Sequence, residues 1–159
     1  LFRARSSYQP VDLDMDVAKK KEHANPVYYV RYADACICAV LRKAAGEGAE
    51  SLSADGLAAK VIPADVDLSV LTHESEIALM RKMDDFGALV ALAARDRAPF
   101  RLTHYAQELA GLFHQFYTNC HIVGEDPAIQ NARLALADAT RTVLALTLDL
   151  IGVSAPERM

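Results

Sequence analysis

The sequence contains no tryptophan, and only seven glycines and six prolines are spread over its 159 residues. Because the two strongest helix breakers are scarce while alanine and leucine are abundant, the composition favours helices over strands. No apolar run approaches the roughly 20 residues that a membrane helix needs, so we expect no membrane association. The hydrophobic content of 52% is too high for a disordered chain and suffices for a buried core.

The three cysteines are odd in number and unevenly spaced, which argues against a disulfide framework and for a reducing compartment. Residues 1–20 also lack the apolar stretch of a signal peptide, so we predict a cytoplasmic protein. The chain begins at Leu1 rather than at methionine. We interpret it as a piece of a longer protein.

Motifs that would support independent catalysis or metal binding are missing from the sequence. It has no glycine-rich phosphate loop, no nucleophile elbow and no zinc-protease motif. On a helix, Cys36 and Cys38 would lie about 200° apart, and Cys120 and His121 are adjacent and diverge, so neither pair can converge on one ion. We predict no metal site and no self-sufficient active site.

Capping residues divide the rest of the chain into helices. Asn25-Pro26 and Asp126-Pro127 each place an N-cap before a proline at the first helical position, and Pro99 begins another helix. We predict an all-α bundle with four long helices and two short ones. The long helices span residues 25–45, 72–95, 100–123 and 127–151, and the short ones lie at Met15–Glu22 and near Leu57.

Two aromatic clusters are candidate binding surfaces. Tyr29 and Tyr32 share a helical stripe with Cys36 and Lys43, beside a predicted core face made of Val30, Ala33, Ile37, Val40, Leu41 and Ala44. A second cluster on the third long helix holds Phe113, His114, Phe116 and Tyr117. Such rings can stack on unpaired RNA bases, but the spacing alone favours their interpretation as packing residues, with Phe113 and Phe116 in the core.

Charge is distributed unevenly along a chain whose net charge is −4. Residues 1–45 carry eight basic and five acidic side chains, residues 46–94 carry three and nine, and residues 95–159 carry six and seven. A polyanion would therefore meet the first segment and selected arginines of the last.

Several runs of the sequence are distinctive when taken together. The longest are VDLDMDVAKKK at residues 11–21, NPVYYVRYA at 25–33 and the terminal APERM at 155–159. Shorter ones are HYAQELA, FHQFY, ARL and ATR, at residues 104–110, 113–117, 132–134 and 139–141. These runs resemble the arginyl-tRNA synthetases, which belong to class I of the aminoacyl-tRNA synthetases. The resemblance implies that residues 1–24 end the catalytic domain and its linker. Residues 25–159 would form the helical anticodon-binding domain, often called the DALR domain.

The resemblance also implies partners and site residues. The full enzyme uses ATP to join arginine to its tRNA, whereas this portion would bind the anticodon stem-loop of tRNA(Arg), chiefly through the middle cytosine. Tyr29 and Tyr32 match tyrosines that line the base pocket, and Tyr117 matches an aromatic that stacks on an anticodon base. Arg42 matches a basic residue of that region, and Met159 matches a terminal methionine near the pocket.

The ATP-site signatures of class I enzymes are absent here. We therefore expect this portion to need no cofactor, to be non-catalytic by itself, and to have the missing catalytic domain of the same chain as a second partner.

Three positions depart from the usual family pattern: Arg31 replaces a glutamine, Asp34 a histidine and Cys36 an arginine. We expect the loss of this arginine and the gain of an acid to weaken a phosphate contact or a catalytic-domain contact of this helix, and Arg31, on another side, to compensate in part. Two other interpretations remain: a helical protein-interaction module, and a small enzyme that uses Cys120 with His114 or His121.

Overall fold

The computed structural model describes residues 25–159, and its first helix begins where the capping residues predict. In α2 (Pro26–Ala45) the Asn25 side chain accepts hydrogen bonds from the amides of Val27 and Tyr28, at 3.1 and 3.4 Å. These bonds satisfy two amide groups that have no partner within the helix. The helix ends at Gly46, whose φ of +69° favours glycine. The predicted segment 1–24, with its helix Met15–Glu22, lies outside the described residues.

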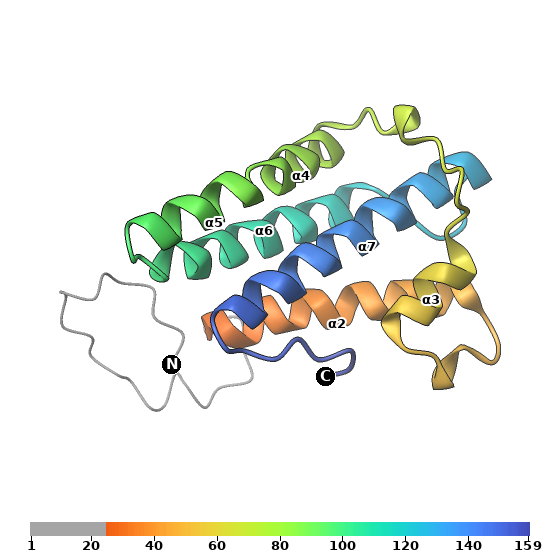
Figure 1. The fold of residues 1–159 in the computed structure, drawn as a ribbon. Coiled ribbons are helices and arrows are strands. Elements are labelled where there is room, and N and C mark those ends of the chain that lie inside the picture. Colours follow the sequence, from red (N-terminus) through yellow and green to blue (C-terminus); the bar gives the residue numbers. More distant parts are fainter. Residues whose placement is uncertain (1–24) are drawn as a thin grey trace.

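The long helices pack into the predicted all-helical bundle (Figure 1). The elements after α2 are η1 (Ala49–Ser51), α3 (Ala54–Val61), η2 (Leu68–Val70), α4 (Glu74–Asp84), α5 (Phe86–Arg95), α6 (Phe100–Asn119) and α7 (Pro127–Leu150). The helices α4 and α5 follow one another along one side of α6, and α7 packs against both α6 and α2. The short helix α3 packs against α2 and α7.

One predicted helix is interrupted. The sequence predicts a continuous helix over residues 72–95, but the structure ends α4 at Asp84 and starts α5 at Phe86, with Asp85 between them. Asp84, Asp85 and Gly87 all have low helix propensity. The Asp85 amide donates to the Arg81 carbonyl at 3.3 Å and also points at the Met83 carbonyl.

The third long helix is shorter than predicted. It ends at Asn119 rather than near Val123, and Cys120 adopts an extended conformation with φ −121° and ψ 111°. Both Cys120 and Ile122 are buried in the core. The chain therefore leaves the helix after Asn119 and buries these two side chains from an extended segment, instead of continuing as a helix to the predicted end at residue 123.

The core lies where α2, α6 and α7 meet. Of the predicted face of α2, Val30, Ala33, Ile37, Val40 and Leu41 are buried and Ala44 is partly buried. In α4 and α5 Leu79 is fully buried, whereas Ile77, Met80, Met83 and Leu92 are only partly buried. The core side of α2 is therefore fixed, and the tyrosine stripe beside it, about a third of a turn away, is left to form a surface.

Candidate nucleic-acid interface

The first aromatic cluster joins the second through His114. The Tyr28 and Tyr32 rings, one turn apart on α2, stack with centroids 6.2 Å apart at 11°. Tyr32 in turn stacks on His114 of α6, at 5.9 Å and 28°, and Tyr29 meets the same imidazole at 5.0 Å. The crossing of α2 and α6 therefore turns two helical stripes into one layer of rings.

The layer continues along α6 to Tyr117. The buried Phe113 ring contacts His114 at 5.7 Å and stacks beneath Tyr117 at 5.9 Å and 17°. Tyr117 itself is 48% exposed. The buried Phe113 ring fixes the orientation of Tyr117, while the outer face of Tyr117 stays open to a ligand.

The other predicted site residues differ in exposure. Tyr32 is 37% exposed and Met159 is 54% exposed, so both are accessible. Tyr29 is only half-buried; its hydroxyl lies near Gly111 of α6, where an added Cβ would be 3.7 Å away. Burial raises the pKa of the Tyr29 phenol. The structure therefore brings Tyr29 and Tyr32 together on His114 and places Tyr117 farther along the same layer.

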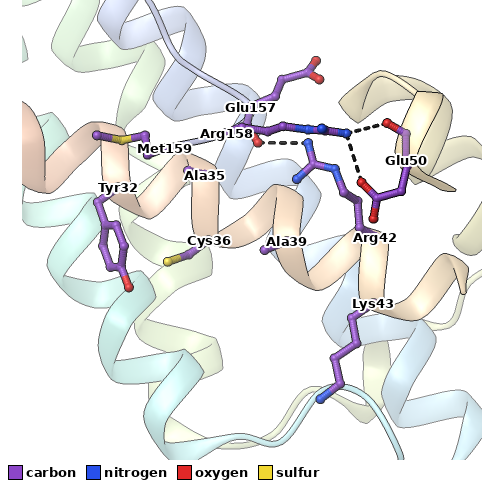
Figure 2. A pocket seen from close by; sticks show the side chains of 10 residues that line it. All are labelled: Tyr32, Ala35, Cys36, Ala39, Arg42, Lys43, Glu50, Glu157, Arg158 and Met159. Atoms are coloured by element: carbon purple, nitrogen blue, oxygen red, sulfur yellow. Dashed lines mark hydrogen bonds and ion pairs between the residues drawn. The ribbon is translucent and has the colours of Figure 1, made fainter.

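Beside the layer a cleft of about 650 Å³ runs along α2 and beneath the C-terminal segment (Figure 2). Its floor consists of the small side chains Ala35, Cys36 and Ala39. The full lining is Tyr32, Ala35, Cys36, Ala39, Arg42, Lys43, Glu50, Glu157, Arg158 and Met159. Three of the five predicted residues, Tyr32, Arg42 and Met159, thus share one cavity.

The last residues of the chain form a wall of this cleft because they are tied to two helices. Arg42 donates through Nη2 to the Glu157 carbonyl oxygen at 2.9 Å. The Glu157 carboxylate accepts a hydrogen bond from the Ala54 amide at the start of α3, at 3.0 Å. Arg158 pairs with Glu50. Arg42 therefore positions the wall that carries Met159.

The polar groups on the aromatic side of the cleft are uncharged at neutral pH. A hydrogen bond with Cys36 raises the pKa of the Tyr32 phenol above its ordinary value. Burial raises the pKa of the Cys36 thiol, which outweighs the opposing effect of its bond to Tyr32. A neutral phenol and a neutral thiol can each donate or accept a hydrogen bond, which suits the polar edge of a base.

The three departures from the family pattern occupy different environments. Cys36 lines the cleft, Arg31 is half-buried, and Asp34 is 2% exposed. Asp34 therefore points into the protein rather than at a ligand. Its burial raises its pKa to about 6, the charge of Arg141 lowers it and that of Glu157 adds to the rise. The acid consequently does not repel a phosphate at the surface.

Sequence reasoning missed several residues of this site. His114 was grouped with neighbouring aromatic residues, but its position between Tyr29 and Tyr32 follows only from the crossing of α2 and α6. Lys43 was predicted to share a stacking and hydrogen-bonding surface with the tyrosines but was not named as a site residue. The walls formed by Glu50, Glu157 and Arg158 depend on tertiary contacts between distant parts of the chain.

Three further findings concern alternative functions. The Cys120 thiol is buried and lies 3.4 Å from the Ser75 hydroxyl, so a substrate cannot reach it. Over residues 25–159, no group of three or more histidine, cysteine, aspartate or glutamate side chains is arranged to hold a metal ion. Within the same residues, none of the helices is both long and apolar enough to cross a membrane.

Comparisons with known proteins agree with this geometry. An arginine–tRNA ligase of Symbiobacterium thermophilum is 46% identical over 99% of the chain, which spans 27% of that relative's length. A structure assigned as an arginyl-tRNA synthetase from Campylobacter jejuni superposes with a TM-score of 0.80 at 26% identity, covering 98% of this chain and 31% of that one. For the Thermus thermophilus arginyl-tRNA synthetase the TM-score is 0.65 at 31% identity, covering 82% and 21%.

A family model described as the DALR anticodon binding domain matches residues 30–159. This match takes in most of α2 with Tyr32, the second aromatic cluster and the C-terminal wall of the cleft, while Tyr29 lies just before its first residue. The chain therefore belongs to the DALR anticodon binding domain family.

Proposed function

We propose that the chain is the anticodon-binding domain of an arginyl-tRNA synthetase and that its cleft receives an unpaired base of the tRNA(Arg) anticodon loop. The observation that carries the proposal is the layer of rings from Tyr32 to Tyr117, which lies open beside a cleft with three basic side chains. Single-stranded RNA binds to such combinations of stacking faces and positive charge.

Each site residue has a role in this proposal. Tyr32 stacks on the base at the cleft mouth, and Tyr29 supports it from the α6 side through His114. Tyr117 offers a second face for a neighbouring base. Arg42 holds the C-terminal wall in place, and Met159 covers the base from that wall.

The catalytic step belongs to the rest of a longer protein. This chain spans about a quarter of the length of the relative from Symbiobacterium. We infer that arginine activation and ATP binding reside in that remaining part, which is the second partner of this domain, and that this chain is non-catalytic and needs no cofactor.

The test measures binding of an RNA hairpin that carries an arginine anticodon, with the middle cytosine intact or replaced by uracil. We expect tighter binding of the cytosine hairpin. Tyr32→Ala and Tyr117→Ala should each weaken it by about 5- to 150-fold, because loss of one base–aromatic stack costs about 1–3 kcal/mol. Fluorescence anisotropy with labelled hairpins gives the dissociation constants.

Leu68→Ala is the matched control, since Leu68 is a large exposed apolar residue that does not line the cleft. It should leave RNA affinity unchanged. If both hairpins bind equally and the tyrosine variants bind like the wild type, the RNA proposal is wrong. Capture of a protein partner through the same surface would then support the interaction-module interpretation.

A further inference from the structure

The cleft has two chemically different ends. Tyr32 and Met159 lie at one end, and Arg42 and Lys43 lie at the other (Figure 2). The small floor residues separate them, so no side chain divides the cavity. A ligand that fills the cleft therefore meets an aromatic, uncharged surface first and positive charge farther along α2.

The negative groups of the cleft already have partners. Glu50 pairs with Arg158, and the Glu157 carboxylate accepts from the Ala54 amide. Arg42 donates to a neutral carbonyl, and its Nε makes no hydrogen bond among the described residues. These partners leave positive charge unbalanced at the far end of the cleft.

Among the cations of the cleft, Lys43 is the one most available to a ligand. It is exposed, and among residues 25–159 it forms no hydrogen bond or ion pair. Figure 2 shows its side chain extending from α2 away from the paired Arg158 and Glu50. An extended ammonium group without an acidic partner is available to a ligand phosphate.

The helix sets the separation between the two ends. Lys43 follows Tyr32 by 11 residues, about three turns, so the two Cβ atoms lie on nearly the same side of α2 and roughly 16 Å apart along its axis. A single base cannot span this separation, but a base with the adjoining sugar–phosphate backbone can.

We propose that Lys43 binds a backbone phosphate of the RNA strand whose base lies against Tyr32, so that the strand runs along α2 from the aromatic end to the cationic end. This proposal rests on the proposed function and adds a phosphodiester subsite to it. Lys43 contributes affinity and strand placement, whereas the choice of base remains with the aromatic end.

The experiment measures affinity for the cytosine hairpin as a function of KCl concentration for the wild type, Lys43→Gln and Lys43→Arg. Each phosphate contact on single-stranded RNA contributes about 0.7 to the slope of log K against log[KCl]. Because this slope is negative, Lys43→Gln should reduce its magnitude by about 0.7. Between about 50 and 200 mM KCl, its affinity deficit should shrink by about two- to threefold. Lys43→Arg should restore the wild-type slope.

Lys60→Gln is the control, because Lys60 is an exposed lysine on α3 that does not line the cleft. It should keep the wild-type slope. The preference for cytosine over uracil should be the same in all four proteins. A wild-type slope in Lys43→Gln overturns the phosphate subsite, whatever the base preference shows.

The two proposals fail in distinguishable ways. Equal binding of both hairpins by the wild type counts against the proposed function, because that result concerns the base. An unchanged salt slope counts against the Lys43 subsite alone, because that result concerns the phosphate. Absence of any RNA binding overturns both.

Discussion

The ion pair between α4 and α7 and the cleft along α2 differ in whether their charged groups have partners within the protein. Between α4 and α7, Glu76 is 1% exposed and accepts from Arg133 Nε at 2.7 Å, while Arg133 Nη1 donates to the His121 carbonyl at 2.6 Å. Glu76 also accepts from the His73 amide at 2.8 Å. In the cleft, by contrast, Lys43 has no such partner among the described residues. Charges that are satisfied internally hold helices together, whereas unsatisfied charges at an open surface are available to a ligand.

The largest expected effect is at the buried pair. Arg133→Ala leaves the Glu76 carboxylate buried without its cation, so we expect the free energy of unfolding to fall by about 3–5 kcal/mol. Urea denaturation followed by circular dichroism measures it. Arg95→Ala removes an exposed arginine that pairs with Asp96, and it should cost less than about 1 kcal/mol. Similar losses in the two variants would contradict the comparison.

At Asp34, the buried acid of α2, we expect a substitution to raise the free energy of unfolding rather than lower it, by an intermediate amount. Because folding raises its pKa to about 6, wild-type stability is lost as pH rises from about 4 to about 6. Asp34→Asn removes this loss and should stabilise the fold above pH 6 by up to about 3 kcal/mol. Urea unfolding at several pH values measures the difference.

Below pH 4 the stabilities of wild type and Asp34→Asn should converge, because both folded and unfolded states then carry a protonated Asp34. Asp65→Asn, at an exposed loop position, is the control, and its difference in stability from the wild type should not change with pH. A variant that is less stable than the wild type at neutral pH would show that the charge of Asp34 stabilises the fold.

The smallest effect is expected at the C-terminal wall. Glu157→Ala removes the hydrogen bond to the Ala54 amide and should cost about 1 kcal/mol in thermal unfolding. The Arg42 bond reaches the Glu157 backbone and is unaffected by the substitution. Freed from α3, the wall should expose Cys36, so this thiol should react faster with an alkylating reagent. Glu157→Gln keeps an accepting oxygen and should stay close to wild type in both measurements.

Much of the fold was predictable from local signals. The Asn25-Pro26 and Asp126-Pro127 pairs begin α2 and α7 as predicted, because capping is decided by residues near the helix end. The helix end at Cys120 was not predictable in this way. At Cys120 the burial of a side chain from an extended segment outweighed the local propensity, and that burial depends on distant residues.

The sequence by itself determined the helices, the core face of α2 and the tyrosine stripe that stands apart from it, because these follow from helical periodicity. Only the tertiary structure decided that His114 joins the two aromatic clusters and that residues 157–159 close a cleft over α2. The physical reason is separation along the chain: the bond from Arg42 to the Glu157 carbonyl joins residues 115 positions apart. Such a contact exists only after α2 and the end of the chain have packed on the same core.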